Sequence, residues 1–351
     1  MSLSYEKAGV NIDNADAAKE QMAEKMETRD PRVLHKKDAF AALYEITGMG
    51  YREPVLVMKT EEPGSKQKLA VQHGRPAGVA YDMIHHLIDD IIVTGARPLL
   101  VQDCIVCGKL EKDVVVALVA AVADACKSND CLLLGGETSE QPGVVDAGVY
   151  ILSSSIVGMV EKSKIIDGRT IAAGDAVVAV ASNGLHTNGY SLVRALMAQQ
   201  PDLPGHKLAG PDGKEETFID AILRPHTCYW QAFKGLFEDN VGGALHGIAH
   251  ITGAGIVGNL ERIMPTGLDA VIEAPKMRIL PLFKLIKQRG NVPEADMLRT
   301  FNCGVGMTIV CAASAAEGII SHVKKHGHDA YLVGRVEKGS GKVRYEGSPV
   351  W

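Results

Sequence analysis

The residues best suited to chemistry directly follow a short apolar run over residues 54–58. A strand-forming segment that ends in carboxylates, a Pro-Gly turn and a Ser-Lys pair brings acid, hydroxyl and ammonium groups to one strand end. Carboxylates can hold Mg²⁺, glycine lets the backbone approach closely, and lysine neutralises a phosphoryl oxygen. The cluster consists of Thr60, Glu61, Glu62, Pro63, Gly64, Ser65 and Lys66. It is typical of a site for metal-bound phosphate, although solvated polar turns use the same residues more often. The spacing is not that of a Walker A loop.

Several other polar groups lie beside glycine or at the expected ends of strands and helices. In a helix expected over residues 81–94, His85 and His86 precede Asp89 and Asp90 by four positions, which places these side chains over one another. The other candidates are Gly136, Glu137 and Thr138 after one strand, His186 and Asn188 after another, and His250 and Asn302 in later glycine-containing turns. Each has an ordinary structural explanation, because carboxylates cap helices or lie on solvated faces and histidines can be satisfied in a core. As a series along the chain, they favour a nucleotide site.

The elements that must position these groups in the first half indicate one mixed α/β unit. We expect helices over residues 11–28, 81–94 and 114–125 and strands over residues 54–58, 98–106, 131–134 and 150–157. Apolar residues recur at helical spacing in the second helix, and Gly95 is its expected end. Asp113 is the expected N-cap of the third helix. Residues 135–143 are expected to form a turn after the buried strand.

A polar, turn-rich segment over residues 162–175 is the expected domain boundary. We therefore predict an N-terminal domain over residues 1–170 and a C-terminal domain over residues 171–351. The second domain is expected to contain a strand over 176–180, a turn over 182–189, a helix over 190–197, a surface loop over 201–213 and a closing strand over 331–336.

Length and composition exclude several classes of protein. A chain of 351 residues is long enough for about two domains, and its formal net charge of -5 argues against a nucleic-acid or anionic-membrane partner. No apolar stretch approaches the roughly 20 residues of a membrane span, and the N-terminus lacks the apolar part of a signal peptide. The seven cysteines are scattered, so we expect reduced thiols, with Cys104 and Cys107 as structural residues. We expect a soluble cytoplasmic protein.

The motifs taken together resemble the phosphoribosylformylglycinamidine cyclo-ligase family, also called aminoimidazole ribonucleotide synthetase. The similarity extends over nearly the whole chain, from about residue 4 to about residue 336. The strongest matches are Gly135-Gly136-Glu137-Thr138, Gly158-Met159-Val160-Glu161-Lys162-Ser163, His186-Thr187-Asn188-Gly189-Tyr190-Ser191-Leu192-Val193-Arg194, His250-Ile251-Thr252-Gly253 and Arg299-Thr300-Phe301-Asn302-Cys303-Gly304-Val305-Gly306-Met307.

This resemblance implies a two-domain fold, with an N-terminal α+β domain that contains a mixed sheet and a C-terminal α/β domain. The N-terminal domain would bind ATP and pair its sheet with that of a second subunit, and the C-terminal domain would close the active-site cleft. In the family, ATP phosphorylates the formyl amide oxygen of formylglycinamidine ribonucleotide, and the amidine nitrogen then closes the imidazole ring of de novo purine biosynthesis. The resemblance therefore implies ATP and Mg²⁺ as cofactors, a small-molecule substrate and a homodimer.

The resemblance also implies roles for individual residues. Its nucleotide-binding residues would be Thr60, Glu61, Gly64, Ser65, Lys66, Asp90, Gly136, Glu137 and Thr138. Among these, Glu61, Asp90 and Glu137 would be Mg²⁺ ligands, and Lys66 would lie near phosphate. The catalytic residues on the second domain would be His186, Asn188, His250 and Asn302, which polarise the amide or hold the substrate phosphate. Which histidine has which role stays open.

The chain departs from the family at the phosphate loop, where Glu62 and Pro63 replace glycine and valine and add charge and stiffness. Before Phe40, lysines stand where the family has glycines, so Lys36 or Lys37 side chains could replace backbone contacts. The additional histidines near Asp90 would suit a transition metal, but the neighbouring oxygen ligands favour Mg²⁺. Two other readings remain: another ATP-dependent member of the same superfamily with a different small substrate, or a non-catalytic nucleotide-binding homologue.

Overall fold

A computed structural model describes residues 12–35, 39–238 and 243–351. The chain divides into two compact units, the first over residues 1–91 and 96–163 and the second over residues 92–95 and 164–351. Lys36, Lys37 and the beginning of the region that resembles the family, up to residue 11, lie outside the described residues.

The first unit is built on a four-stranded sheet. Its elements are α1 (Ile12–Lys25), β1 (Pro54–Glu61), α2 (Lys66–Gln72), α3 (Pro76–Ile92), β2 (Arg97–Cys107), α4 (Lys112–Lys127), β3 (Leu132–Glu140) and β4 (Tyr150–Glu161). The strand order is β1-β4-β2-β3. β4 runs antiparallel to β1 and β2, whereas β3 runs parallel to β2. The sheet is therefore mixed, as predicted.

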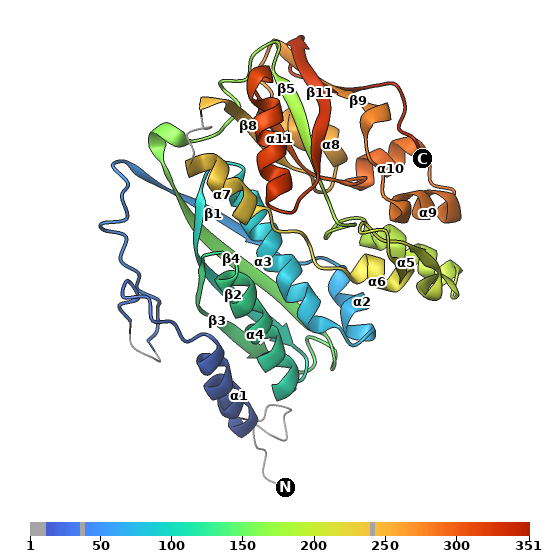
Figure 1. Cartoon of the computed structure of the whole chain (residues 1–351). Coiled ribbons are helices and arrows are strands. Elements are labelled where there is room, and N and C mark those ends of the chain that lie inside the picture. The colour runs from blue at the N-terminus through green and yellow to red at the C-terminus, as the bar shows by residue number, and fades with distance from the viewer. Residues whose placement is uncertain (1–11, 36–38, 239–242) are drawn as a thin grey trace. The chain divides into compact units, whose positions relative to one another are not determined.

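Helices α3 and α4 lie against one face of this sheet (Figure 1). The apolar side of α3 predicted from helical spacing is buried, with exposures of at most 1% for Ile84, Leu87, Ile88, Ile91 and Ile92. Burying an isoleucine or leucine side chain contributes about 1.5–3 kcal/mol, so this helix is held mainly by its packing. Gly95 follows the helix with φ of +81° and donates its amide to the Ile92 carbonyl at 2.9 Å, which confirms the predicted helix end.

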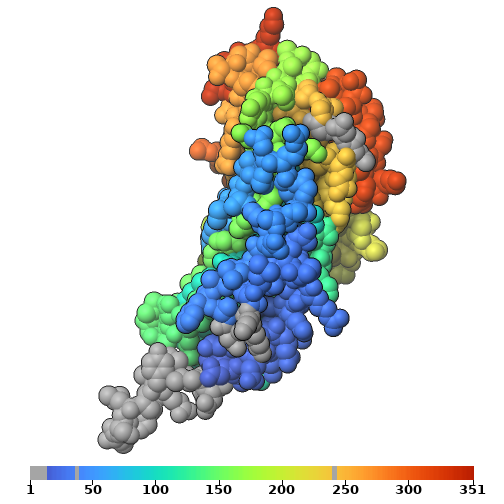
Figure 2. Space-filling view, turned by 90° about the vertical axis from the view of Figure 1, so that its left-hand side faces the viewer, coloured from blue at the N-terminus to red at the C-terminus, as the bar shows by residue number. Residues whose placement is uncertain are grey.

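The opposite face of the sheet carries apolar side chains that stay exposed. Burial alternates along β1, and Leu56 and Met58 on the outer side are 54% and 71% exposed. Ile151, on the neighbouring strand β4, is 42% exposed. We call the face that carries these three residues the open face. Figure 2 shows the blue segment before β1 on the surface of the first unit. Phe40, which belongs to the chain before β1, is also exposed.

The second unit is built on a six-stranded sheet with the order β12-β9-β11-β5-β10-β8. Its elements are β5 (Ala176–Ala181), α5 (Tyr190–Gln199), β6 (Lys207–Ala209), β7 (Glu215–Thr217), α6 (Phe218–Leu223), α7 (Trp230–Glu238), β8 (Leu245–His250), α8 (Gly255–Leu260), β9 (Leu268–Glu273), α9 (Pro281–Gly290), α10 (Glu294–Thr300), β10 (Val305–Cys311), α11 (Ala316–Lys325), β11 (Ala330–Lys338) and β12 (Val343–Glu346). The pairing is antiparallel except between β12 and β9.

The core of the second unit surrounds β5 and β10, two neighbouring strands inside the sheet. Every residue of β10 is buried, as is every residue of β5 except the last. Such continuous burial requires cover on both faces of the sheet, which explains why these strands are nearly uninterrupted apolar runs. Helix α11 packs against β5 and β11, and α8 packs against β8, β10 and β12. Among the described residues, no helix is both long enough and apolar enough to cross a membrane.

Three local predictions were wrong. The N-cap of α4 is Glu111, and Asp113 lies in the first turn instead. The segment predicted as a turn after residue 134 continues as strand through Glu140, because β2 supplies a parallel partner for it. The predicted loop over residues 201–213 contains β6, which forms a hairpin with β7.

Candidate functional site

In the first unit, strand register places two acidic residues in one row across the sheet. Glu61 is opposite Ser154, Ser154 is opposite Asp103, and Asp103 is opposite Gly136. Residues that are directly opposite each other point to the same face of a sheet, and neighbouring strands are about 4.8 Å apart. Ser154 is 2% exposed and Asp103 is 7% exposed, so this is the face that the helices cover. The sheet thus directs two carboxylates, Glu61 and Asp103, toward its helix-covered side.

Lys59 links this row to α3. Its ammonium lies 2.7 Å from a carboxylate oxygen of Glu61 and 3.1 Å from one of Asp90. Burial by itself would lower the pKa of Lys59, but hydrogen bonds to Glu61 and Asp90 raise it above its usual value. The same Asp90 oxygen is 3.5 Å from Nε2 of His86, one helical turn earlier. The structure therefore brings the predicted ligands Glu61 and Asp90 together around one cation.

Glu137 does not join this group within the sheet. It is opposite Cys104, one position beyond the row of Asp103, and successive residues of a strand point to opposite faces. Glu137 is exposed, on the open face. That it shares one metal site with Glu61 and Asp90 stays a prediction, which the register of this sheet does not support. Thr138 returns to the helix-covered face, where its hydroxyl approaches the sulfur of Met22 at 4.0 Å.

Asp103 is a candidate that the sequence patterns missed. It interrupts an apolar strand, and its burial raises the pKa of its carboxyl to about 7. A Cβ at Gly136 would lie 1.9 Å from Oδ1 of Asp103, so the predicted nucleotide-binding glycine is required by this carboxylate. The available signal was a single acidic residue in the middle of a buried strand. Its relation to Glu61 depends on strand pairing, which the spacing of residues did not reveal.

The pKa of Asp103 predicts a pH-dependent stability in the absence of divalent cations. The folded-state pKa is raised from 3.8 to about 7, so the folded protein holds the proton more tightly than the unfolded chain does. Stability is fully present below the unfolded pKa and falls as the pH rises through 7. Between pH 5 and 7, wild type should lose up to about 1.4 kcal/mol per pH unit relative to Asp103→Asn. Urea unfolding of both proteins in EDTA measures this difference, and parallel pH profiles would contradict the prediction.

Lys66 lies in a buried ion pair. It begins α2, is 1% exposed, and donates to Oδ1 of the fully buried Asp82 at 2.8 Å. The loop before it places Glu62 in solvent and buries Pro63. Gly64 has φ of +65°, which a residue with a side chain rarely adopts. The structure thus gives Lys66 a carboxylate partner within its own unit, and contact of Lys66 with phosphate stays a prediction.

Two other residues of the predicted phosphate loop have different surroundings. Thr60 lies in β1 on the open face, where its hydroxyl is 2.8 Å from that of Ser155. Ser65 is the residue before α2, and its side chain makes no capping hydrogen bond. Of the predicted loop residues, only Glu61 therefore lies in the row of carboxylates.

In the second unit, the ends of three strands meet at one edge of the sheet. Ala181, the last residue of β5, is opposite Val305, the first residue of β10, and His250 at the end of β8 is opposite Met307. The turn that contains His186 follows β5 directly. His186 has φ of +58°, and the hydroxyl of Tyr190 donates to its carbonyl at 3.2 Å. The topology thus brings the two predicted histidines together from distant parts of the chain.

A third histidine, His226, completes this group. The rings of His186 and His226 stack with centroids 3.8 Å apart, and Nε2 of His226 is 3.2 Å from Nε2 of His250. All three side chains are buried. Sequence reasoning missed His226 because no glycine-containing motif surrounds it. We call His186, His226 and His250 the histidine cluster.

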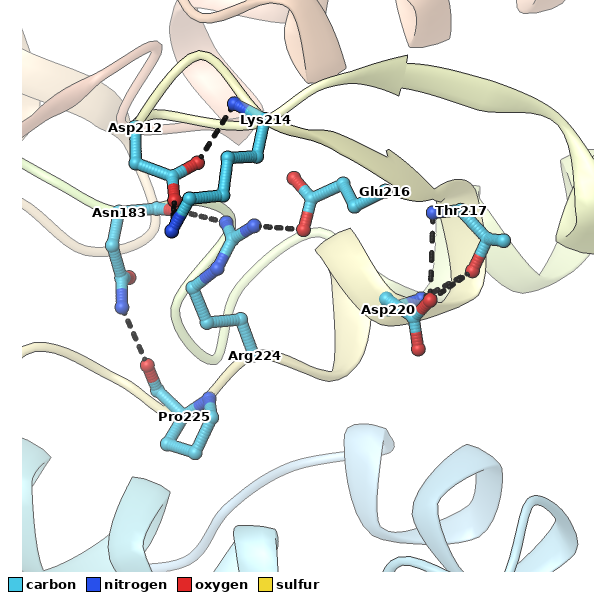
Figure 3. A network of polar contacts seen from close by, with 8 residues as sticks. All are labelled: Asn183, Asp212, Lys214, Glu216, Thr217, Asp220, Arg224 and Pro225. Carbon is cyan, nitrogen blue, oxygen red and sulfur yellow. Dashed lines mark hydrogen bonds and ion pairs between the residues drawn. The ribbon is translucent and has the colours of Figure 1, made fainter.

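A polar network fixes the segment that leads to His226 (Figure 3). The guanidinium of Arg224 donates to the carbonyl of Asn183 and to the carboxylate of Glu216. The side-chain amide of Asn183 donates to the carbonyl of Pro225 at 2.8 Å. These hydrogen bonds join residue 183, just before His186, to residues 224–225, just before His226.

The two predicted asparagines differ in their surroundings. Asn302 is buried, donates to the carbonyl of Gly184 at 2.9 Å, and accepts from the hydroxyl of Ser182 and the amide of Gly304. Its amide thus joins two turns, which supports a positioning role, and the contact with substrate stays a prediction. Asn188 is partly exposed, and its Oδ1 lies 3.2 Å from the place of a Cβ on Gly253. It remains a candidate for substrate contact.

Gly189, which follows Asn188, provides a stability prediction. It has φ of +80°, and a Cβ there would lie 2.0 Å from the ring of Phe301. Gly189→Ala should therefore cost roughly 3 kcal/mol, from backbone strain and overpacking. Gly174→Ala is the matched control, because Gly174 has φ of +95° and open space around it, so that only about 1 kcal/mol of strain is expected. Denaturant unfolding measures both, and equal losses would contradict the role of Phe301.

Comparison with known proteins places the chain in a family. The profile of the AIR synthase related protein N-terminal domain matches residues 41–160, and that of its C-terminal domain matches residues 172–346. A phosphoribosylformylglycinamidine cyclo-ligase of Aromatoleum aromaticum is 40% identical over 96% of this chain and 95% of its own length. One of Geobacillus kaustophilus is 36% identical over 97% of both chains. The chain belongs to the phosphoribosylformylglycinamidine cyclo-ligase family. The resemblance found in the sequence motifs is thereby confirmed.

Solved structures agree on the cyclo-ligase fold at low sequence identity. Hydrogenase maturation protein HypE in complex with ATP aligns with a TM-score of 0.70 and 16% identity, covering 97% of this chain and 92% of its own. Thiamine-monophosphate kinase from Stenotrophomonas maltophilia K279a aligns with a TM-score of 0.65 and 16% identity, covering 94% and 96%. These similarities concern the fold, and the predicted combination of a mixed-sheet domain with a second α/β domain is correct.

Proposed function

We propose that this chain catalyses the ATP-dependent ring closure of formylglycinamidine ribonucleotide to aminoimidazole ribonucleotide, ADP and phosphate. The observation that carries the proposal is identity of 36–40% to named cyclo-ligases over nearly the full length of both chains. The first unit would bind ATP, and the second would close the cleft over the substrate. The proposed pathway is de novo purine biosynthesis.

The carboxylates of the first unit fit Mg²⁺, which prefers oxygen ligands. We propose Glu61 and Asp90 as ligands and add Asp103, whose buried carboxyl would be stabilised as an anion by a nearby cation. When bound, Mg²⁺ would neutralise charge on the transferred phosphoryl group. Lys59 already lies between two of these carboxylates, so it can compensate their charge before the metal binds. Glu137 lies on the open face, so it would bind Mg²⁺ only if further ligands reach the metal from that face.

The turns of the second unit would hold the reacting amide. His186 and His250 would polarise the formyl oxygen or hold the substrate phosphate, and Asn188 would contribute hydrogen bonds from the partly exposed part of the same turn. Asn302 would act indirectly by fixing the turns over 182–184 and 302–304. Positioned donors of this kind stabilise developing charge without reorganisation in the transition state.

The open face supports the proposal of a homodimer. Leu56, Met58 and Ile151 expose apolar surface on one side of a sheet whose other side is covered by α3 and α4. A second copy of the same face would bury this surface. A cytoplasmic location is proposed with it, because all seven cysteines are free thiols, which persist in a reducing compartment.

One assay tests the reaction. Purified protein is incubated with ATP, Mg²⁺ and formylglycinamidine ribonucleotide, and ADP and aminoimidazole ribonucleotide are followed together. We expect both products in equal amounts, dependent on the substrate. Formation of ADP only with a different acceptor would indicate another member of the superfamily. Binding of ATP without any turnover would indicate a non-catalytic homologue.

A further inference from the structure

We propose that the histidine cluster is a binding site for a divalent transition-metal cation, with Zn²⁺ the ion it suits best. The site lies within the second unit and is made of His186, His226 and His250. The proposed Mg²⁺ ligands, by contrast, are carboxylates of the first unit. The binding proposal does not depend on the proposed reaction.

The distance between two of the rings already matches a metal site. Nε2 of His226 and Nε2 of His250 are 3.2 Å apart. In a tetrahedral zinc site each nitrogen is about 2.0–2.1 Å from the metal, so two ligating nitrogens are about 3.3 Å apart. A zinc ion could therefore bind to both nitrogens with little change in their separation.

The third ring is near but not yet aligned. A ligand nitrogen of His186 lies within 4.8 Å of those of the other two histidines. Its ring stacks on that of His226 with an interplanar angle of 24°, whereas shared coordination requires the nitrogens to point at one place. Metal binding must therefore rotate the His186 or the His226 ring. The backbone needs no comparable change, because the hydroxyl of Tyr190 holds the turn of His186.

The chemistry of the cluster favours a borderline metal. His186, His226 and His250 are 2%, 1% and 6% exposed, so a cation bound between them would be shielded from solvent. A neutral imidazole offers an in-plane lone pair, which suits Zn²⁺, Cu²⁺ or Ni²⁺ better than Mg²⁺. The contact between His226 and His250 requires a proton on one of the two nitrogens, and a bound cation would take the place of this proton.

The backbone around the cluster is fixed in advance. Arg224 and Asn183 tie the segment before His226 to the turn that precedes His186. His250 is held in register at the end of β8 by its pairing with β10. A site whose ligands are carried by fixed elements loses less entropy when the ion binds.

Zinc binding is tested on the complete chain without any enzyme assay. Protein freed of metal with a chelator is titrated with ZnCl₂ by calorimetry, and Co²⁺ is used as a spectroscopic probe because four-coordinate Co²⁺ absorbs strongly in the visible range. We expect one ion per chain in this site. X-ray absorption at the zinc edge should show nitrogen neighbours at about 2.0–2.1 Å, whereas binding by the cysteines would show sulfur at about 2.3 Å.

Variants identify the ligands. His226→Gln should weaken zinc binding at least about 100-fold, the upper end of what loss of a supporting group costs. His206→Gln, a more exposed histidine of the same unit, is the matched control and should bind like wild type. Circular dichroism shows whether His226→Gln is folded. If it is not folded, the X-ray absorption spectrum of zinc-bound wild type identifies the ligands instead. Unchanged affinity in folded His226→Gln, sulfur ligands, or no binding would overturn the proposal.

If the proposed reaction also holds, Zn²⁺ in this site would occupy His186 and His250 and should inhibit turnover. Inhibition that EDTA reverses is then expected in wild type and should be weaker in His226→Gln. A protein that binds zinc but does not form aminoimidazole ribonucleotide would leave the metal site standing and reject the proposed function, so the two failures are distinguishable.

Discussion

Asp90→Asn is expected to lower kcat/KM for formylglycinamidine ribonucleotide on the order of 100-fold. Asp90 is a proposed Mg²⁺ ligand, and asparagine keeps its shape but loses the negative charge. Loss of even a supporting group at a metal site costs about 10–100-fold, and a ligand should be at the upper end of that range. The substitution also removes the ion pair between Asp90 and Lys59, while the ion pair between Lys59 and Glu61 is retained.

Steady-state kinetics at several Mg²⁺ concentrations separate a metal ligand from a structural residue. A lost ligand should raise the Mg²⁺ concentration needed for half-maximal rate, whereas a folding defect would lower the amount of active enzyme at every concentration. Asp146→Asn, at an exposed site of the same unit, is the control and should retain wild-type rates. Turnover of Asp90→Asn within about twofold of wild type would mean that the site is misplaced.

Lys66→Met is expected to destabilise the protein by about 3–5 kcal/mol. The ammonium of Lys66 and the carboxylate of Asp82 are 2.8 Å apart and 1% and 0% exposed. Removing one member of a buried ion pair leaves the other charge in a medium of low polarity. Breaking such a pair costs about 3–5 kcal/mol in other proteins, and we expect a loss of this size here. Urea unfolding at neutral pH measures the loss.

The double variant Lys66→Met/Asp82→Leu distinguishes the ion pair from other causes. Replacing both charges by apolar side chains of similar size is often neutral, so the double variant should recover most of the lost stability. If Lys66 also contacts phosphate, as predicted from the motif, the recovered protein should still bind ATP more weakly than wild type. Recovery of both stability and ATP binding would assign Lys66 a structural role alone.

The sequence predicted best those features that depend on one segment. The apolar side of α3 follows from helical spacing, and all five predicted side chains are buried. The polar side of the same helix was harder, because Asp82 and Asp89 are fully buried and a solvated face was one of the expectations. Spacing along a helix shows which residues share a side, but not what the rest of the chain packs against that side.

Features that depend on strand pairing were missed or misplaced. Residues 135–140 look like a turn because glycine and polar residues dominate them, yet β2 provides the hydrogen bonds that make them a strand. The same register separates Glu137 from Glu61 and places Asp103 in the row of Glu61. Similarly, His226 joins His186 and His250 through tertiary packing of segments without a shared motif. Long-range register of this kind cannot be read from spacing within one segment.

The position of β4 in the first sheet has a consequence for the order of folding. β4 is the last strand of its unit in sequence, yet it lies between β1 and β2 and pairs with both. Pro54 of β1 pairs with Glu161, so β1 gains its strand partner only after residue 161 has been synthesised. During synthesis on the ribosome, the backbone hydrogen-bonding groups of β1 would remain without a strand partner until β4 has emerged. Such long-range pairing slows folding and leaves the nascent chain open to aggregation. We therefore expect folding of this unit during synthesis to depend on chaperones.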